Sequence, residues 1–108
     1  MAQQSETPVL DLLVGMSAQS IEASSLDQRT LMLVRIAALV AVDAPPASYM
    51  LNLGAAADAG LDAEQVRGIL AAVAPIVGTP RIASAAGNIT RGLGLALELA
   101  ELEQEAAE

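Results

Sequence analysis

The sequence predicts an all-α protein of one domain, and three observations carry this prediction. Apolar residues recur at spacings of three and four in several segments, which is the period of an amphipathic helix. Pro, Gly, Ser and Asp stand between these segments, where helices begin and end. No segment shows the two-residue alternation or the enrichment in β-branched residues that is typical of strands. With 108 residues the chain has the length of a single domain with one modest core.

The first two helices are predicted from their N-terminal residues. Thr7 precedes Pro8, and proline is tolerated in a first turn because the N–H that it lacks has no partner there. We therefore expect a short first helix over residues 7–16. The stretch SSLDQR supplies Ser and Asp caps for a second helix over residues 27–42.

Proline and glycine bound the third and fourth helices. The double proline at 45–46 ends the second helix, because a residue before proline disfavours helical backbone, and it opens the third. Gly60 suits a left-handed cap, so the third helix is predicted to run to it. Asp62 caps a fourth helix, with Gln65 three residues on as in a capping box. Pro75 is expected to kink or end this helix.

Two more helices are predicted in the C-terminal part of the chain. Residues 78–80, Gly-Thr-Pro, stop the fourth helix and start a fifth over 80–93. Gly92 and Gly94 predict a turn, and a last helix over 95–104 follows before an acidic tail. The fifth helix carries a polar stripe made of Arg81, Ser84, Asn88 and Arg91. The expected architecture is a helical bundle of about six helices.

Charge and composition exclude several classes of function. The net charge of −8 and the pI near 4.2 argue against nucleic acid and anionic membranes as partners. Without cysteine the chain has no disulfides, thiol catalysis or thiolate metal sites. Its first residues lack the pattern of a signal peptide, and the apolar run at 31–42 is too short to span a bilayer. We expect a cytoplasmic protein with no cofactor and no metal.

The apolar content predicts self-association. Hydrophobic residues make up 54% of the chain but aromatic residues only 1%, and the mean hydropathy is +0.50. A small subunit of this composition keeps apolar surface that its own core cannot cover. A homo-oligomer is the expected solution.

Three further motifs receive structural interpretations. The Gly-x-Gly of RGLGLALEL follows no strand, so a turn between helices fits it better than a nucleotide loop. Glu98, Glu101 and Glu105 share a helical face, where a solvated surface is favoured over a cation site. The DAGLD stretch at 58–62 lacks the ligand spacing of a calcium loop.

Arg35, Tyr49 and Asn52 are the polar residues that could serve a ligand. Arg35 lies in an apolar helix, so it either extends to the surface, pairs with a carboxylate at an interface, or faces a polar cavity. The structural interpretations are favoured, because structural ion pairs also bury arginines. Tyr49 and Asn52 lie three residues apart, nearly on one face. Tyr49 either donates to a ligand or is the one large core residue with its hydroxyl at the rim of the core, and the core is favoured.

The order of these pieces resembles the carboxymuconolactone decarboxylase-like family, which includes the alkyl hydroperoxidase D proteins. The resemblance covers about residues 26–89. It rests on the apolar helix LMLVRIAALVAV, the helix that opens at the double proline, the turn GLDAEQVRGIL, and the sequence GTPR at 78–81. It implies one family domain over residues 1–108, with an N-terminal arm (1–25), a core (26–94) and a C-terminal helix with an acidic tail (95–108).

The resemblance places the family's redox motif on residues that cannot perform its chemistry. Counting back from Gly60, the two family cysteines correspond to Pro45 and Ser48, and the family histidine corresponds to Asn52. Proline and serine are not redox-active, and an amide does not titrate near neutral pH. We expect no peroxidase activity. The family's known assemblies also imply a homo-oligomer, often a trimer or hexamer.

Two hypotheses about function follow. In the first, a pocket between the second and third helices binds a small carboxylated molecule, as a binder or as a non-redox lyase or isomerase. Arg35 would hold the carboxylate, and Ser48, Tyr49 and Asn52 would supply neutral donors. Lactone decarboxylation itself is doubtful, because no general base is evident. In the second, the protein is structural or mediates interactions, and the ancestral site is degenerate.

Overall fold

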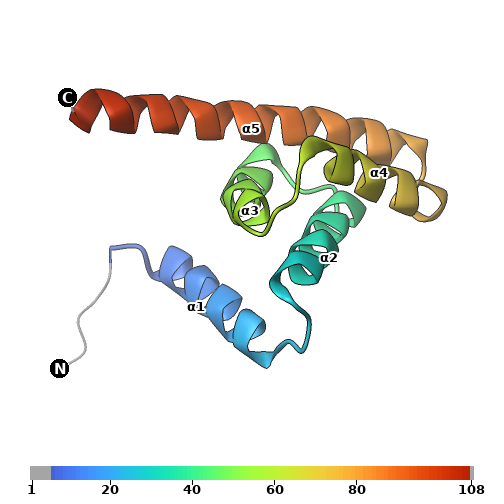
Figure 1. Cartoon of the computed structure of the whole chain (residues 1–108), viewed down its shortest axis with the longest axis horizontal. Helices are drawn as coiled ribbons and strands as arrows, with labels where there is room; N and C mark the ends of the chain where they lie inside the picture. Colours follow the sequence, from blue (N-terminus) through green and yellow to red (C-terminus); the bar gives the residue numbers. More distant parts are fainter. Residues whose placement is uncertain (1–5, 108) are drawn as a thin grey trace.

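Five α-helices make up residues 6–107, the part of the chain that the computed structural model describes, and that part contains no strand (Figure 1). The helices are α1 (Pro8–Ala23), α2 (Gln28–Ala41), α3 (Pro46–Asp58), α4 (Ala63–Val77) and α5 (Thr79–Ala107). The long α5 runs across α3 and α4, and α2 packs against the same two helices (Figure 1). The predicted all-α fold class is confirmed. None of the described helices is long and apolar enough to cross a membrane.

Two of the predicted N-terminal caps are present. Asp27 Oδ1 accepts the backbone N–H of Thr30 at 2.8 Å, and this bond is the main reason why the pKa of Asp27 lies below its usual value. Asp62 Oδ1 accepts the N–H of Gln65 at 2.9 Å, while Gln65 Oε1 accepts the N–H of Asp62 at 3.0 Å. This reciprocal pair is the expected capping box. Local bonds therefore begin α2 and α4 at the expected residues.

Three helix ends differ from the prediction. α1 continues to Ala23 instead of ending at Met16, because no residue in MSAQSIEA stops a helix. α4 continues past Pro75, which lies in its last turn, where the missing N–H removes a single helical bond. α3 ends shortly before Gly60, which adopts a positive φ of 90° outside the helix.

The predicted break at Gly92 and Gly94 is wrong, and so the count of helices in the described residues is five, not six. α5 passes through both glycines without interruption. A Cβ added at Gly92 would lie 2.8 Å from the carbonyl oxygen of Pro46 and 3.0 Å from Cβ of Tyr49. Gly92 is thus the point where α5 approaches the backbone of α3, and its lack of a side chain serves packing, not a turn.

The core consists of two clusters that share α2. One contains Met32, Ile36, Ala56, Leu61 and Ile69, and the other contains Val40, Ala44, Tyr49 and Ala85. Tyr49, Ile36 and Val40 are the largest fully buried side chains. As the composition predicted, aliphatic residues and alanine form almost all of this core, so α2, α3, α4 and α5 pack closely.

α1 stands apart from this core. It contributes no buried residue, and Figure 1 shows it beside the body, joined through the start of α2. The radius of gyration is 15.5 Å, whereas a compact domain of this length has about 13 Å. The shape is therefore that of a body formed by α2, α3, α4 and α5, with α1 as an arm beside it.

Candidate functional site

The resemblance assigns the family's redox motif to the end of the α2–α3 connection and the first turns of α3. Asp43 in this connection has a positive φ of 55°, which is uncommon for a residue with a side chain. Pro45 is the N-cap residue of α3 and makes no side-chain hydrogen bond. Ser48, one turn later, donates its backbone N–H to the carbonyl of Pro45 at 3.0 Å. The backbone is thus arranged as a helix start, but the side chains bring neither a thiol nor an imidazole.

The polar stripe of α5 holds this connection in place. Its bonds run from Arg81 Nη1 to the carbonyl of Ala41, from Ser84 Oγ to Asp43 Oδ1 at 2.7 Å, and from Asn88 Nδ2 to the carbonyl of Ala44 at 3.2 Å. Arg91 in turn donates to Asn88 Oδ1 at 3.1 Å. The stripe therefore serves the fold, and it satisfies one backbone carbonyl in the last turn of α2 and one just after it.

Tyr49 lies in the core and lines none of the depressions described here. Its side chain is 0% exposed and packs with Val40, Ala44 and Ala85. The buried hydroxyl has no hydrogen-bond partner in the described part of the chain. Burial raises the pKa of the Tyr49 phenol, and the negative charge of Asp43 raises it further. The ring fills the space between α3 and α5, and its hydroxyl is inside the core instead of at its rim.

Arg35 and Asn52 come together at an open depression of about 370 Å³ between α1, α2 and α3. Arg35 is half-buried, and its guanidinium donates from Nη1 to Ser17 Oγ at 3.0 Å and from Nη2 to the carbonyl of Ser17 at 3.2 Å. Among the side chains that the structure describes, it has no carboxylate partner. Ser20 also lines this depression. The polar groups around the arginine are thus neutral.

Ser48 is not part of this depression. It is half-buried, and its carbonyl accepts the Asn52 side-chain amide at 2.8 Å, which fixes the orientation of Asn52. Of the four residues predicted to form a site, the structure therefore joins Arg35 with Asn52 and places Ser48 and Tyr49 elsewhere on α3. The described residues contain no group of three or more His, Cys, Asp or Glu side chains that could hold a metal ion.

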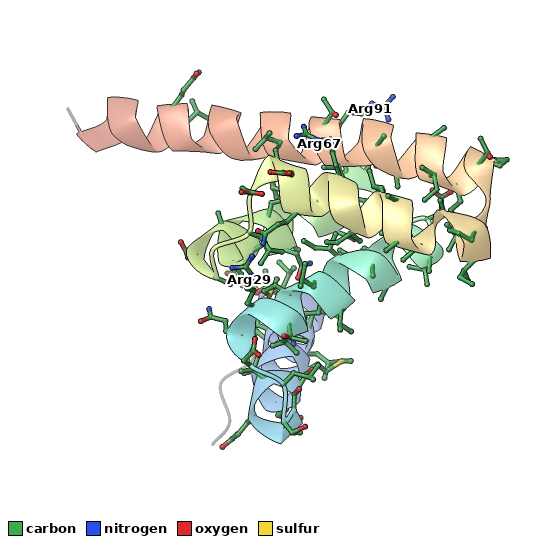
Figure 2. The ribbon with its side chains drawn as sticks, turned by 45° about the vertical axis from the view of Figure 1, so that its right-hand side comes forward. Arg29, Arg67 and Arg91 are labelled. Carbon is green, nitrogen blue, oxygen red and sulfur yellow. The ribbon has the colours of Figure 1, made fainter. Side chains whose placement is uncertain are left out.

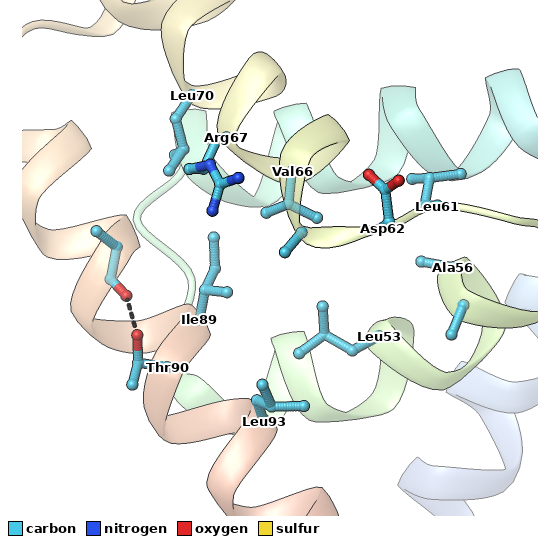
Figure 3. A pocket seen from close by; sticks show the side chains of 13 residues that line it. Leu53, Ala56, Leu61, Asp62, Val66, Arg67, Leu70, Ile89, Thr90 and Leu93 are labelled. Carbon is cyan, nitrogen blue, oxygen red and sulfur yellow. Dashed lines mark hydrogen bonds between the residues drawn. The ribbon is translucent and has the colours of Figure 1, made fainter.

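A second cleft, of about 360 Å³, lies between α3, α4 and α5, and the sequence did not predict it (Figure 3). Its lining is mostly aliphatic, and Arg67 of α4 contributes a charged group. The available signal was the sequence VRGIL, in which one of five basic residues of the chain stands among apolar ones. Figure 2 shows that Arg67, Arg29 and Arg91 belong to three different helices.

The comparisons with known proteins agree with this architecture. The model of the Carboxymuconolactone decarboxylase family matches residues 7–90, which begins earlier than the resemblance over 26–89 and includes α1. No curated protein and no solved structure matches the chain. Because the family model matches most of its length, the chain belongs to the carboxymuconolactone decarboxylase family, as a member without cysteine or histidine.

Proposed function

We propose that this chain binds a small carboxylated molecule without redox chemistry, at the depression between α1, α2 and α3. One observation carries the proposal: Arg35 is half-buried, and in the described part of the chain its guanidinium donates only to the neutral oxygens of Ser17. A guanidinium has five N–H groups, of which Ser17 takes two. The others can donate to a carboxylate, and a forked arginine–carboxylate contact is strong and directional.

The surroundings of Arg35 favour binding over catalysis. The polar side chains beside it, Ser17, Ser20 and Asn52, do not titrate near neutral pH. The nearest candidate base by sequence, Asp43, instead accepts a hydrogen bond from Ser84 in the α2–α3 connection. A lyase or isomerase would need a group that moves a proton. A binder needs only the arginine and its neutral neighbours.

The Arg35→Met variant tests this proposal, because methionine keeps an apolar stem and removes the charge. Affinity for a small dicarboxylate such as muconate, measured by calorimetry, should fall at least about tenfold, as expected for one lost charge-assisted contact. The melting temperature should change by only a few degrees, since the lost partners are neutral and exposed. Arg29→Met on the same helix is the matched control and should bind normally.

The opposite result would identify a structural arginine. Removing one member of a buried ion pair strands the other charge and costs about 3–5 kcal/mol. If Arg35→Met loses that much stability, or loses its assembly, Arg35 pairs with a carboxylate of a neighbouring subunit and the ligand proposal is wrong. Unchanged muconate affinity in a stable variant would exclude the proposed site equally clearly.

Peroxidase activity is expected to be absent. The positions of the family's thiols carry Pro45 and Ser48, and Asn52 stands where the family has histidine. The pure protein with an organic hydroperoxide and a dithiol should consume peroxide no faster than the reagents alone. Steady turnover above that blank rate would contradict this prediction.

α1 favours a second function, in which the chain acts as an interaction protein. Its large apolar side chains are exposed, among them Leu12 at 63% and Val14 at 69%. An exposed apolar helix of this kind is typical of an interface. The partner that we propose is a second copy of the chain, and small-molecule binding and self-association are compatible.

A further inference from the structure

The cleft between α3, α4 and α5 combines an apolar interior with one cation at its mouth (Figure 3). Its main apolar side chains are Leu53, Leu61, Val66, Leu70, Ile89 and Leu93. The volume of about 360 Å³ falls in the range of roughly 300–1,000 Å³ that small-molecule sites occupy. The cleft lies on the side of α3 that Leu53 and Ala57 form, away from the Arg35 depression.

Of the polar groups that line this cleft, Arg67 is the one without a partner. Asp62 Oδ1 accepts the Gln65 N–H at 2.9 Å as the cap of α4. Thr90 Oγ1 donates to the carbonyl of Ala86 at 2.9 Å, within α5 (Figure 3). Arg67 makes no hydrogen bond or ion pair in the described part of the chain. In Figure 3 it extends from α4 toward the side of the cleft where Ile89 lies.

We infer that this cleft binds a linear alkyl carboxylate, with the chain among the aliphatic side chains and the carboxylate on Arg67. The two halves of such a ligand match the two halves of the cleft. Burying each methylene is worth about 0.8 kcal/mol, which is about a fourfold gain in affinity. The guanidinium fork fits a carboxylate with two parallel hydrogen bonds. The net charge of −8 repels anions at long range, so the attraction must come from the direct contact between the carboxylate and Arg67. Physiological salt screens the long-range repulsion.

The first experiment measures the affinity of the full chain for hexanoate, octanoate and decanoate by calorimetry in physiological salt. We expect about a fifteenfold gain for each pair of added methylenes, until the cleft is filled. Octanol, which has the same chain as octanoate without the charge, should bind more weakly. No measurable binding of decanoate, or binding that does not depend on chain length, would overturn the inference, and occupation of the cleft by a second copy would give the first of these results.

Two variants separate the anchor from the apolar interior. Arg67→Met should weaken octanoate binding at least about tenfold and leave octanol binding unchanged, with little loss of stability because Arg67 is exposed. Ala57→Leu, which adds bulk inside the cleft, should weaken both ligands. Arg91→Met removes an exposed arginine that does not line the cleft (Figure 2) and is the matched control. Equal octanoate affinity in the Arg67 and Arg91 variants would overturn the role of Arg67.

This site and the proposed function can fail separately. The alkyl carboxylate site depends on Arg67 and the muconate site depends on Arg35, and the two sites share no lining residue. If Arg35→Met lost octanoate binding and Arg67→Met bound octanoate normally, the ligand would lie in the Arg35 depression and the inference would be wrong. Loss in Arg67→Met alone supports the inference, whatever the result with muconate.

Discussion

Gly92→Ala is expected to destabilise the fold by about 1–3 kcal/mol, as overpacking does. The added Cβ would lie 2.8 Å from the Pro46 carbonyl oxygen and 3.1 Å from the backbone nitrogen of Met50. Neither atom can move as a flexible side chain can, so α3 and α5 must separate where Tyr49 packs between them. Urea denaturation followed by circular dichroism should show a much lower midpoint than for the natural chain.

Gly94→Ala is the matched control for this variant. A Cβ at Gly94 meets nothing within 4 Å, so the change should stabilise α5 by up to about 1 kcal/mol through helix propensity. The two substitutions have the same chemistry and opposite expected signs. If both variants were more stable than the natural chain, the close contact between α3 and α5 would be wrong. If both were less stable, a turn at the two glycines would be favoured.

Assembly should give the second large effect. The solvent-accessible surface is 7623 Å², whereas a compact monomer of 11.0 kDa exposes roughly 5,600 Å². The excess, about 2,000 Å², is comparable to the surface buried in a stable protein interface. Light scattering on a sizing column should therefore give a multiple of the chain mass, and the family resemblance favours three or six copies. A clean monomer at micromolar concentration would refute the proposed assembly.

Charges placed on α1 should dissolve this assembly. Val9 is 67% exposed and Leu12 is 63% exposed in a single subunit, so Val9→Glu with Leu12→Glu adds charge without disturbing the core. We expect a shift to the monomer mass at unchanged helix content, because burying carboxylates in an apolar interface is costly. Gln19→Glu adds one charge on the same helix at a polar position and should leave the mass unchanged. Full assembly of the double variant would show that α1 lies outside the interface.

The site was only partly accessible from the sequence. The absence of a cysteine and histidine redox motif follows from residue types alone. The separation of Tyr49 from Arg35 could not be predicted in this way. Tyr49 and Asn52 lie three residues apart on α3, but they contact different neighbours because α3 is packed on two sides. α5 covers the Tyr49 side of α3, whereas α1 and α2 border the Asn52 side. The sequence did not predict the role of Arg67, because its cleft exists only once α3, α4 and α5 have packed together.

The sequence by itself determined the helical class, the start of α2 at Asp27 and the start of α4 at Asp62. These features depend on residues within one helical turn, whose capping bonds form whatever lies around them. Only the tertiary structure decided the roles of Gly92 and of the polar stripe on α5. A glycine in a turn and a glycine at a helix contact are the same letter, and the difference is the Pro46 carbonyl that lies opposite it. The polar stripe on α5 has the sequence of a solvated face as well. Its role follows from the bonds that Arg81 and Asn88 donate to the carbonyls of Ala41 and Ala44.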